Sequence, residues 1–444
     1  MKPYQKHILR RYLWISFTSI IGSLIILAIF YGFYSKKENN QLNQIVFENK
    51  TQLWNAEIKF SDAHILRFQI ETLKSDTSSY FNSITVINGD ERLPLKHHKQ
   101  GENLTKTIWQ FPFESELHLE NSKELKGYFL KIETKESYPF TSSPAIVSKE
   151  NNVEKINRFS ANEFNKNSEK KTFPFAKRFL IKLRSNSENS KSAIGEFIQK
   201  PNSNEYHGSI ITETGDYRYL AGNRFGNKLF LSTFDGVHAY TFFINIKENG
   251  EITGRHFSGA NYSEPFIGRS DSVSKLRNPY RITTGEENSK VDIKLPEYET
   301  GEIIHLITGR GKVTLIQVMG SWCPNCLDES AFFKELKAYD DLDIYALAFE
   351  KSSNRDESIS AIKKVVDYLD LNYPILFAGK AQSGAVEEML PIKNFISYPT
   401  YLLYDREGKL IEVHAGFSGP ATQGYKDFTK KLHSKIQDLL NKKL

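Results

Sequence analysis

The sequence contains very little cysteine, with only Cys323 and Cys326 in a chain of 444 residues. A structural zinc site needs four good ligands, and the histidines that would have to complete one, such as His305 and His414, show no ligand spacing. We therefore expect no metal site and no other cofactor. The scarcity of cysteine also suits an oxidising compartment, where additional thiols would form wrong disulfides.

The chain also lacks a strong excess of charge of either sign. Its 59 basic and 53 acidic residues give a formal net charge of +6, which is small for this length and does not indicate a nucleic-acid partner. A hydrophobic content of 39%, with 13% aromatic residues, is ample for packed cores. The length predicts two or three domains, and the composition excludes an intrinsically disordered protein.

One run near the N-terminus, residues 12–34, carries no charged residue and is long enough to span a bilayer as a helix. The alternative is a cleaved signal peptide. Such a peptide normally has a shorter apolar core and a small-residue cleavage site, whereas bulky aromatic residues follow Ala28. No cysteine lies near the run to carry a lipid. We therefore expect an uncleaved, single-pass transmembrane anchor in contact with the lipid bilayer.

The charges that flank this run predict its orientation. Residues 1–11 contain four lysines and arginines and no acid, whereas Glu38 accompanies the two lysines that follow the run. Basic residues accumulate on the cytoplasmic side of a membrane segment. We expect residues 1–11 in the cytoplasm and residues 35–50 as a polar tether. The remaining domains would then lie across the inner (cytoplasmic) membrane, which in a bacterium is the periplasmic side.

Residues 51–275 have the pattern of short strands separated by turns, without a long amphipathic helix. The segment 51–148 predicts a β-rich domain, in which Asn88-Gly89 is a strong signal for a two-residue hairpin turn. The segment 149–275 continues with expected strands such as Asp216–Leu220, at a spacing typical of an antiparallel sandwich or barrel. The sequence leaves open whether this second β-rich region is continuous with the first.

From residue 276 to residue 444 the pattern changes to alternating strands and helices, which predicts an α/β domain with a central sheet. Val313–Met319 is an apolar run of strand length, and Asp328–Tyr339 has helical periodicity. The only two cysteines lie between these segments, within Gly-Ser-Trp-Cys-Pro-Asn-Cys at residues 320–326. The dithiol is therefore expected where a strand is followed by a helix.

A Cys-x-x-Cys pair at the start of a helix has the electrostatics of a redox dithiol. The unpaired N–H groups and partial positive charge at the helix N-terminus favour a thiolate on the first cysteine. We expect the sulfur of Cys323 to be exposed and to attack, and Cys326, one turn into the helix, to resolve the mixed disulfide. A thiol peroxidase is disfavoured because the sequence around Cys323 lacks the Thr/Arg environment that such an enzyme needs.

Glu329 falls on the same helix face as Cys326 and several apolar residues. A carboxylate aimed into a core is held partly protonated by desolvation, which would suit it as a proton acceptor for Cys326. The alternative is that Glu329 lies at the rim of this face and is solvated. Pro399 directly precedes the expected strand Thr400–Tyr404, an ordinary place for proline. A cis Tyr398–Pro399 bond facing the dithiol would be functional.

The C-terminal part of the chain, residues 276–444, resembles the thioredoxin-fold thiol-disulfide oxidoreductases of the TlpA/ResA-like type. The resemblance rests on the Trp-Cys-Pro-Asn-Cys motif at residues 322–326, on Glu329, on a strand–helix insert at residues 343–378, and on Tyr398-Pro399-Thr400. It implies a cis Pro399, a catalytic acid at Glu329, a redox-active Cys323–Cys326 disulfide, and substrate contacts from Trp322, Pro324 and Tyr398.

Two positions depart from thioredoxin itself. Pro324-Asn325 stands where thioredoxin has Gly-Pro, which leaves the redox potential open. Gln317 stands where thioredoxin has a buried Asp, which puts the proton-acceptor role more on Glu329.

The upstream half is similar to the β-rich extensions of TlpA-like proteins from Bacteroidetes, on the segments Thr214–Leu220 and Leu231–Gly236. Together the features imply a membrane-anchored, extracytoplasmic enzyme that reduces oxidised substrate proteins. Its electrons would come from a membrane donor such as a transmembrane thiol reductase. The alternative is an envelope protein whose β-rich region binds a partner or ligand while the thioredoxin-like domain is regulatory.

Overall fold

The computed structural model describes residues 50–74, 81–99, 106–121, 125–145, 147–150, 153–156, 158–159 and 172–442. The expected anchor at residues 12–34 lies outside these residues, and no helix within them is long and apolar enough to cross a membrane. By their internal contacts, residues 52–72 and 83–444 form one compact unit, to which every contact discussed below belongs. Of the other unit, residues 1–51 and 73–82, only strand ends are described.

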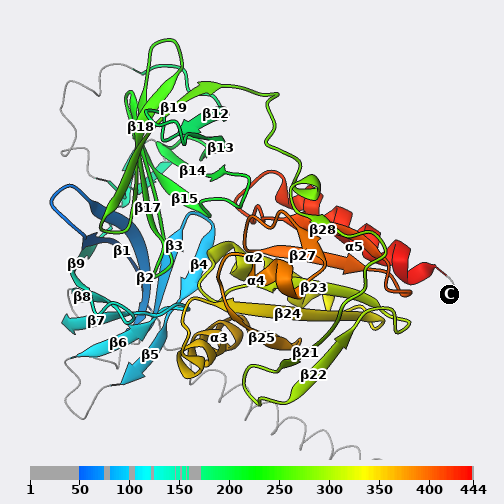
Figure 1. Ribbon diagram of the computed structural model, residues 1–444. Coiled ribbons are helices and arrows are strands. Elements are labelled where there is room, and N and C mark those ends of the chain that lie inside the picture. Colours follow the sequence, from blue (N-terminus) through cyan, green and yellow to red (C-terminus); the bar gives the residue numbers. More distant parts are fainter. Residues whose placement is uncertain are drawn as a thin grey trace, which may run out of the picture. The chain divides into compact units, whose positions relative to one another are not determined.

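The first β-rich part is a nine-stranded sheet with the strand order β4-β3-β2-β1-β9-β8-β7-β6-β5 (Figure 1). On β3 and β4, Ile84, Val86 and Leu93 are buried and are preceded by exposed or half-buried residues, the pattern of an antiparallel sheet with one face in a core; the last two residues of β3 are buried as well. The strands are β1 (Lys50–Lys59), β2 (Ile65–Lys74), β3 (Phe81–Asn88), β4 (Glu91–Pro94), β5 (Lys96–Lys99), β6 (Thr107–Gln110), β7 (Ser115–Asn121), β8 (Lys126–Lys131) and β9 (Ser137–Pro144).

The hairpin between β3 and β4 differs from the expectation by one residue. Asn88 pairs with Glu91 across the hairpin, so the two turn residues are Gly89 and Asp90, and Gly89 takes a φ of +60°. The amide of Asn88 instead donates to the carbonyl oxygen of Phe234 at 2.9 Å and accepts from its N–H at 3.1 Å. Asn88 therefore acts as a contact to the second β-rich part.

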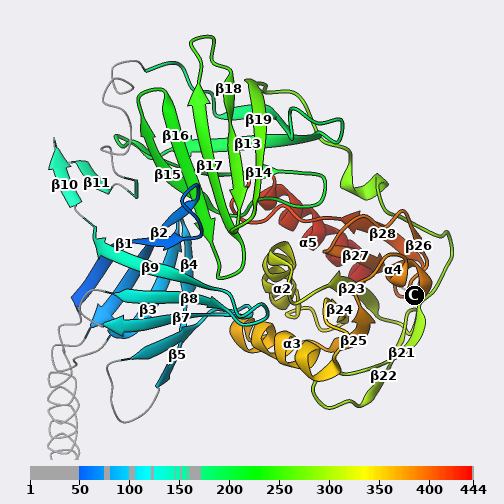
Figure 2. The ribbon, with the colours of Figure 1, turned by 60° about the vertical axis from the view of Figure 1, so that its left-hand side comes forward.

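The second β-rich part is a closed antiparallel barrel with the strand order β12 to β19, separate from the nine-stranded sheet (Figure 2). Its strands are β12 (Arg178–Leu183), β13 (Lys191–Gln199), β14 (Glu205–Ile211), β15 (Leu220–Phe225), β16 (Lys228–Phe234), β17 (Ala239–Ile246), β18 (Ile252–Ser258) and β19 (Tyr262–Ser270). A small hairpin of β10 (Val147–Glu150) and β11 (Val153–Ile156) precedes it. The sequence left a sandwich and a barrel open, and the closed strand order selects the barrel.

The expected strand Asp216–Leu220 is wrong. Most of this segment is a loop between β14 and β15, and only its last residue, Leu220, starts a strand. The carboxylate of Asp216 accepts from the N–H of Arg218 at 2.6 Å, and Arg218 takes a φ of +54°. A left-handed residue cannot continue a strand, because strand residues have negative φ. The loop therefore turns instead of extending.

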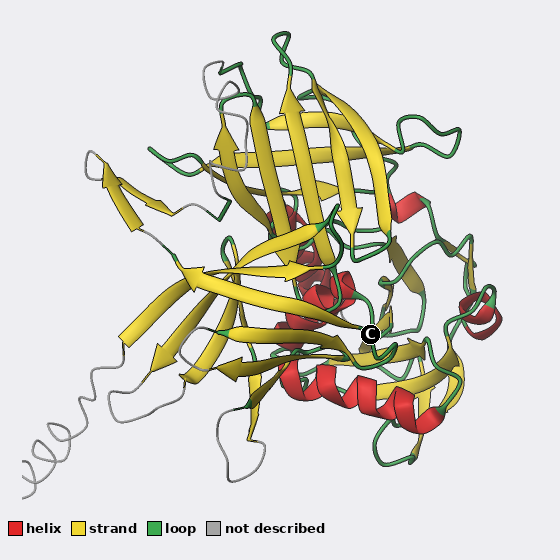
Figure 3. Ribbon diagram, turned by 90° about the vertical axis from the view of Figure 1, so that its left-hand side faces the viewer, coloured by secondary structure: helices red, strands yellow, loops and turns green. Residues whose placement is uncertain are grey.

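Within the described residues, every helix follows residue 276. Figure 3 shows the helices as red ribbons. The C-terminal domain has a five-stranded sheet with the order β25-β24-β23-β27-β28. β24 pairs in parallel with both β23 and β25, whereas β27 pairs antiparallel with β23, and the edge strand β28 pairs antiparallel with β27. The strands are β23 (Val313–Met319), β24 (Leu342–Glu350), β25 (Ile375–Lys380), β27 (Thr400–Tyr404) and β28 (Leu410–Ala415).

Helices and a hairpin cover the two faces of this sheet. One core includes side chains of α2 (Pro324–Leu336), α3 (Arg355–Leu369) and α5 (Tyr425–Asn441). The core of the opposite face includes α4 (Ala385–Met389) and the hairpin of β21 (Asp292–Pro296) and β22 (Ile303–Ile307). Short elements complete the domain: η2 (Pro279–Arg281), β20 (Thr284–Gly285) and β26 (Ile392–Lys393). This arrangement is a thioredoxin-like fold for part of the chain.

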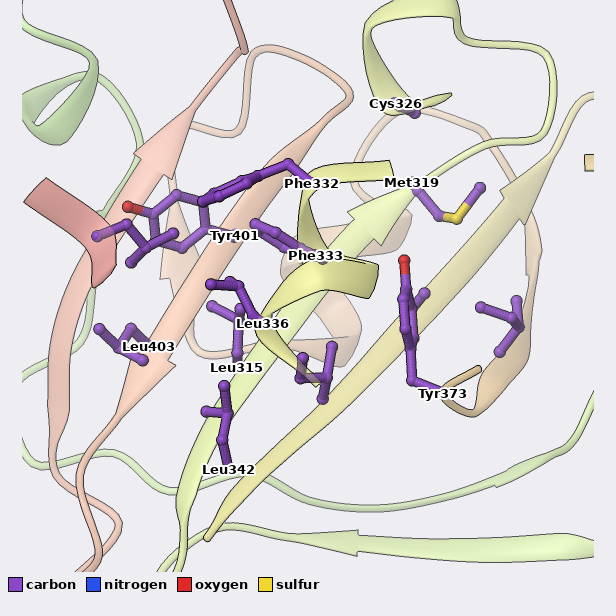
Figure 4. Close-up of a cluster of buried hydrophobic side chains, with 14 of the residues drawn as sticks. Leu315, Met319, Cys326, Phe332, Phe333, Leu336, Leu342, Tyr373, Tyr401 and Leu403 are labelled. Atoms are coloured by element: carbon purple, nitrogen blue, oxygen red, sulfur yellow. The ribbon is translucent and has the colours of Figure 1, made fainter. Parts of the chain in front are cut away.

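The helix that carries the dithiol is anchored by one apolar face. α2 begins at Pro324, four residues before the expected start, because proline is favoured at the first position of a helix. Phe332, Phe333 and Leu336 are buried against β23 and β27, where Figure 4 shows them beside Leu315 and Tyr401. Burial of such side chains stabilises the packing by about 1.5–3 kcal/mol each, which fixes the helix start relative to the sheet.

Candidate functional site: a buried dithiol

The two thiols lie where β23 is followed by α2. Cys323 is the N-cap of the helix, and its Sγ accepts from the N–H of Cys326 at 3.2 Å. The same sulfur lies 3.5 Å from the carbonyl oxygen of Tyr398. Both cysteines are free thiols. The capping sulfur thus satisfies one of the backbone N–H groups that a helix start leaves without an intrahelical partner.

The expectation that the sulfur of Cys323 is exposed is wrong. Cys323 is only 4% exposed, and Cys326 is fully buried. Tyr240 on β17 of the barrel lies close to the pair: burial raises the pKa of its phenol, and the negative charges of Asp235 and of a Cys323 thiolate contribute to the rise. Both cysteines belong to the core of their own domain, against which Trp322 and Tyr398 pack.

Glu329 points into the core beside the inner thiol. It is fully buried, so the solvated alternative is wrong. Burial raises the pKa of Glu329 from 4.5 to about 8, and a hydrogen bond from Gln317 opposes this rise. Burial also raises the pKa of the Cys326 thiol, and the charge of Glu329 adds to that effect. One carboxylate oxygen, Oε1, has no hydrogen-bond partner among the described residues, so it can accept a proton.

Gln317 lies on the strand face that meets α2. Side chains two positions apart in a strand share a face, and its neighbours on that face, Leu315 and Met319, belong to the core that contains α2. Its Nε2 donates to Oε2 of Glu329 at 2.9 Å. Its Oε1 accepts from the hydroxyl of Ser330 at 3.0 Å and lies 3.4 Å from that of Tyr373. The amide is thus fixed in one orientation, with its donor directed at Glu329.

The residues expected to contact substrate gather around the outer thiol. The Tyr398–Pro399 peptide bond is cis. The ring of Tyr398 packs edge-on against Trp322, with centroids 5.3 Å apart. The indole N–H of Trp322 donates to the carbonyl oxygen of Phe349 at 3.1 Å, and Lys351 lies 4.8 Å from the centre of its ring. Pro324 is the first residue of α2.

Sequence reasoning missed Glu350, at the end of β24. It is buried, and its carboxylate binds Ser321 twice, accepting from the backbone N–H at 2.9 Å and from the hydroxyl at 2.6 Å. Burial raises the pKa of Glu350 to about 7. Both bonds hold the turn that leads into Cys323. A glutamate at the end of an apolar strand, close in space to the motif but 24 residues beyond Cys326, gave no recognisable signal.

A pocket of about 610 Å³ adjoins this turn. It is lined by residues of all three parts of the compact unit, among them Phe113, Val237, Trp322, Glu350, Lys351 and Lys364. Trp322 and Ser321 form its wall on the side of the dithiol. The pocket therefore offers room for a ligand beside the aromatic residue that precedes Cys323.

Sequence reasoning also assigned no role to Asp216 and Arg218, which contact the two residues between the cysteines. Both belong to the segment Thr214–Leu220, one of the two pieces that carried the upstream resemblance. The sequence therefore singled out this segment, but its contacts with the dithiol motif appear only in the folded protein.

Comparison with known proteins finds thioredoxin-like and thiol-disulfide oxidoreductase sequences similar to part of this chain. No family model matches the chain. The thioredoxin-like protein YneN of Bacillus subtilis (strain 168) is 29% identical over 119 residues, which are 26% of this chain and 64% of that protein. The thiol-disulfide oxidoreductase ResA of Bacillus thuringiensis subsp. konkukian (strain 97-27) is 27% identical over 138 residues, covering 30% of this chain and 74% of that protein. The chain thus spans somewhat less than two thirds of the first relative and about three quarters of the second.

Solved structures similar to part of the chain include two thiol-disulfide proteins. A secreted Mycobacterium tuberculosis disulfide oxidoreductase, homologous to Escherichia coli DsbE, has 16% identity and a TM-score of 0.26, covering 33% of this chain and 96% of that one. A thioredoxin-family thiol:disulfide interchange protein from Chlorobium tepidum has 14% identity and a TM-score of 0.27, covering 36% of this chain and 99% of that one. The resemblance of the upstream half to Bacteroidetes extensions stays a prediction. The sequence relatives are consistent with a protein disulfide oxidoreductase, and part of the chain has the thioredoxin-like fold.

Proposed function

We propose that the protein is a membrane-anchored, extracytoplasmic thiol-disulfide oxidoreductase that reduces disulfides of substrate proteins through its Cys-Pro-Asn-Cys dithiol. The observation that carries the proposal is the arrangement of three groups. Cys323 caps the helix that carries Cys326, and the buried carboxylate of Glu329 lies on the same face of that helix. A nucleophile, a resolving thiol and a proton acceptor are the parts that a dithiol reductase needs.

The reaction begins with attack of the Cys323 thiolate on a sulfur of the substrate disulfide. The substrate S–S bond breaks, a mixed disulfide forms with Cys323, and the first substrate sulfur leaves as a thiolate that takes up a proton. In the second step Cys326 must lose its proton, which its burial opposes. Glu329 accepts this proton at its free Oε1 oxygen.

The Cys326 thiolate then attacks the sulfur of Cys323. The Cys323–Cys326 disulfide forms, and the second substrate sulfur leaves as a thiolate that takes up the proton held by Glu329. Two electrons and two protons have passed to the substrate, and the dithiol has been oxidised. A membrane electron donor, such as a transmembrane thiol reductase, would restore the dithiol. The charge-free run at residues 12–34 and the basic residues before it support placing this reaction outside the cytoplasm.

Trapping of mixed disulfides tests this proposal. In Cys326→Ser the second step is blocked, so mixed disulfides with other proteins should accumulate at Cys323 and appear by mass spectrometry after thiol blocking. Cys323→Ser lacks the attacking sulfur and should accumulate none. The opposite pattern would show that the two roles are assigned wrongly, and trapping by neither variant would contradict a reductase.

A second function is favoured by one observation, the burial of Cys323. A covered thiol also suits an envelope protein whose β-rich region binds a partner while the thioredoxin-like domain regulates that binding. In this case Cys323→Ala would leave the cellular phenotype intact, whereas deletion of residues 53–270 would abolish it. In the reductase proposal Cys323→Ala abolishes the phenotype as well.

A further inference from the structure

The loop between β14 and β15 of the barrel binds the Pro-Asn dipeptide of the dithiol motif. It is a compact turn, in which Thr212 N–H donates to the carbonyl oxygen of Gly215 at 2.7 Å and Tyr217 N–H donates to that of Ile210 at 3.0 Å. Arg218 adopts the left-handed conformation, with a φ of +54°. Such conformations are strained for residues other than glycine and persist where the surrounding contacts enforce them.

Asp216 at the centre of this loop is buried and binds on both carboxylate oxygens. Oδ1 accepts from the side-chain amide of Asn325 at 3.2 Å, and Oδ2 accepts from the N–H of Gly419 at 2.7 Å. The same amide lies 3.4 Å from the backbone carbonyl oxygen of Asp216. The neighbouring Gly215 has no side chain, and a Cβ there would lie 2.5 Å from the Asn325 side chain. The loop therefore fits closely around Asn325.

Arg218 holds the other residue of the dipeptide. Its guanidinium donates to the carbonyl oxygen of Pro324 at 3.2 Å and to Oδ1 of Asp328 on α2 at 3.1 Å. It also pairs with Glu91 on β4, and Asp235 lies 3.9 Å away. Arg218 is buried, so solvent screens these charges little.

We propose that Asp216 and Arg218 are positioning residues of the dithiol. Through Asn325 and Pro324 they hold the two residues that separate the cysteines, so that the barrel sets both the access to Cys323 and the equilibrium between dithiol and disulfide. This inference rests on the proposed function and adds the residues that tune it. It also gives the β-rich region a role in the redox chemistry. The closed ring of a Cys-x-x-Cys disulfide includes Pro324 and Asn325, and contacts to these residues act directly on its geometry.

Two measurements on the full-length protein in detergent test the proposal. The first is the rate at which iodoacetamide alkylates Cys323 in the reduced protein, followed by mass spectrometry. The second is the equilibrium constant of the Cys323/Cys326 couple with glutathione. Asp216→Asn and Arg218→Lys should each raise the alkylation rate and change the equilibrium constant by at least about twofold, the lower end of couplings between contacting residues. Loss of packing elsewhere would not move the equilibrium constant.

Arg158→Lys is the matched control. Arg158 is also a buried arginine, and it binds the carbonyl oxygens of Ile87 and Ala221; among the described residues its side chain makes no hydrogen bond to α2. It should leave both quantities unchanged. A double-mutant cycle tests the contact itself. In the Asn325→Ala variant, adding Asp216→Asn should not change the equilibrium constant further, because the contact between Asp216 and Asn325 is already absent.

The proposal is overturned if folded Asp216→Asn and Arg218→Lys match the wild type in both measurements. It is also overturned if Asp216→Asn acts equally in the presence and absence of Asn325. Should either barrel variant fail to fold, Asn325→Ala removes the contact of Asp216 with the dipeptide and Asp328→Asn weakens the anchoring of Arg218 on α2, and an unchanged alkylation rate in both overturns the proposal. A wild-type protein that forms no reversible disulfide would contradict the proposed function instead.

Discussion

The side-chain amide of Gln317 donates a hydrogen bond of 2.9 Å to the buried carboxylate of Glu329. This contact joins the central strand to the helix that carries the dithiol. It stabilises the ionised form of a carboxylate that its burial otherwise keeps protonated. The two residues thus bring the pKa of an acid in the core into the range where it exchanges protons near neutral pH.

Glu329→Gln should slow the resolving step and leave the first attack intact. The substitution keeps the shape of the side chain and removes the group that accepts the proton of Cys326. General-base catalysis contributes about 10²–10⁴-fold, so the mixed disulfide with Cys323 should decay at least about 10²-fold more slowly. Rapid-quench thiol trapping with a model disulfide substrate measures this decay. The exposed Glu388→Gln on α4 is the control and should behave as the wild type.

The same substitution should change how stability depends on pH. The pKa of Glu329 is about 8 in the folded protein and 4.5 as its ordinary value, so the folded state binds this proton more tightly. The stabilisation is complete below about pH 4.5 and is lost as the pH rises through 8, at up to about 1.4 kcal/mol per pH unit. The wild type therefore loses stability between pH 5 and pH 8.5, whereas Glu329→Gln does not. The free energy of unfolding of the variant minus that of the wild type should be larger at pH 8.5 than at pH 5. Denaturant unfolding at both values measures this difference, and equal differences would contradict the buried carboxylate.

Gln317→Leu should shift the pH dependence of resolution upward. Loss of the amide donor removes the hydrogen bond that lowers the pKa of Glu329, so the carboxylate ionises at higher pH. The variant should also lose about 1–3 kcal/mol of stability, because the hydroxyl of Ser330 loses its acceptor and Glu329 its donor. The decay rate of the mixed disulfide, measured between pH 6 and pH 10, tests the direction. A shift to lower pH would refute the role given to Gln317.

Ser321→Ala should weaken the turn before the dithiol. The variant loses the 2.6 Å hydrogen bond from the hydroxyl to Glu350, which is worth about 1.5–3 kcal/mol for a charged acceptor. The pKa of Glu350, already raised to about 7 by burial, should rise further because this bond lowers it. Denaturant unfolding at pH 8.5 should show a larger loss than at pH 5. Ser289→Ala, on an exposed loop, serves as the control and should show no such difference.

The sequence was informative where local rules decide the structure. The seven-residue strand Val313–Met319 was predicted with its observed bounds, because an apolar run of that length has few other interpretations. The helix face of Cys326 and Glu329 followed from the 3.6-residue period, and both side chains are buried. What failed depends on distant segments. The loop at Asp216–Leu220 was read as a strand, although Asp216 binds the backbone N–H of Arg218 and the side chain of Asn325.

The burial of Cys323 illustrates the same limit. Cys323 is only 4% exposed because it packs into a core with side chains from β23, β27 and α5, which no local motif specifies. Asp216 lies 109 positions from Asn325, and no periodicity or motif links residues so far apart. Pairings of this kind are fixed by the tertiary packing of three sheets.

A redox titration of the Cys323/Cys326 couple tests the central claim most directly. The full-length protein is equilibrated in glutathione buffers of known potential, and the free thiols are counted by alkylation and mass spectrometry. We predict one two-electron transition at a potential more negative than about −200 mV, as expected of a reductase, and its loss in both Cys323→Ser and Cys326→Ser. A midpoint near about −120 mV would indicate an oxidant instead. Failure of the two thiols to interconvert with a disulfide would contradict the account.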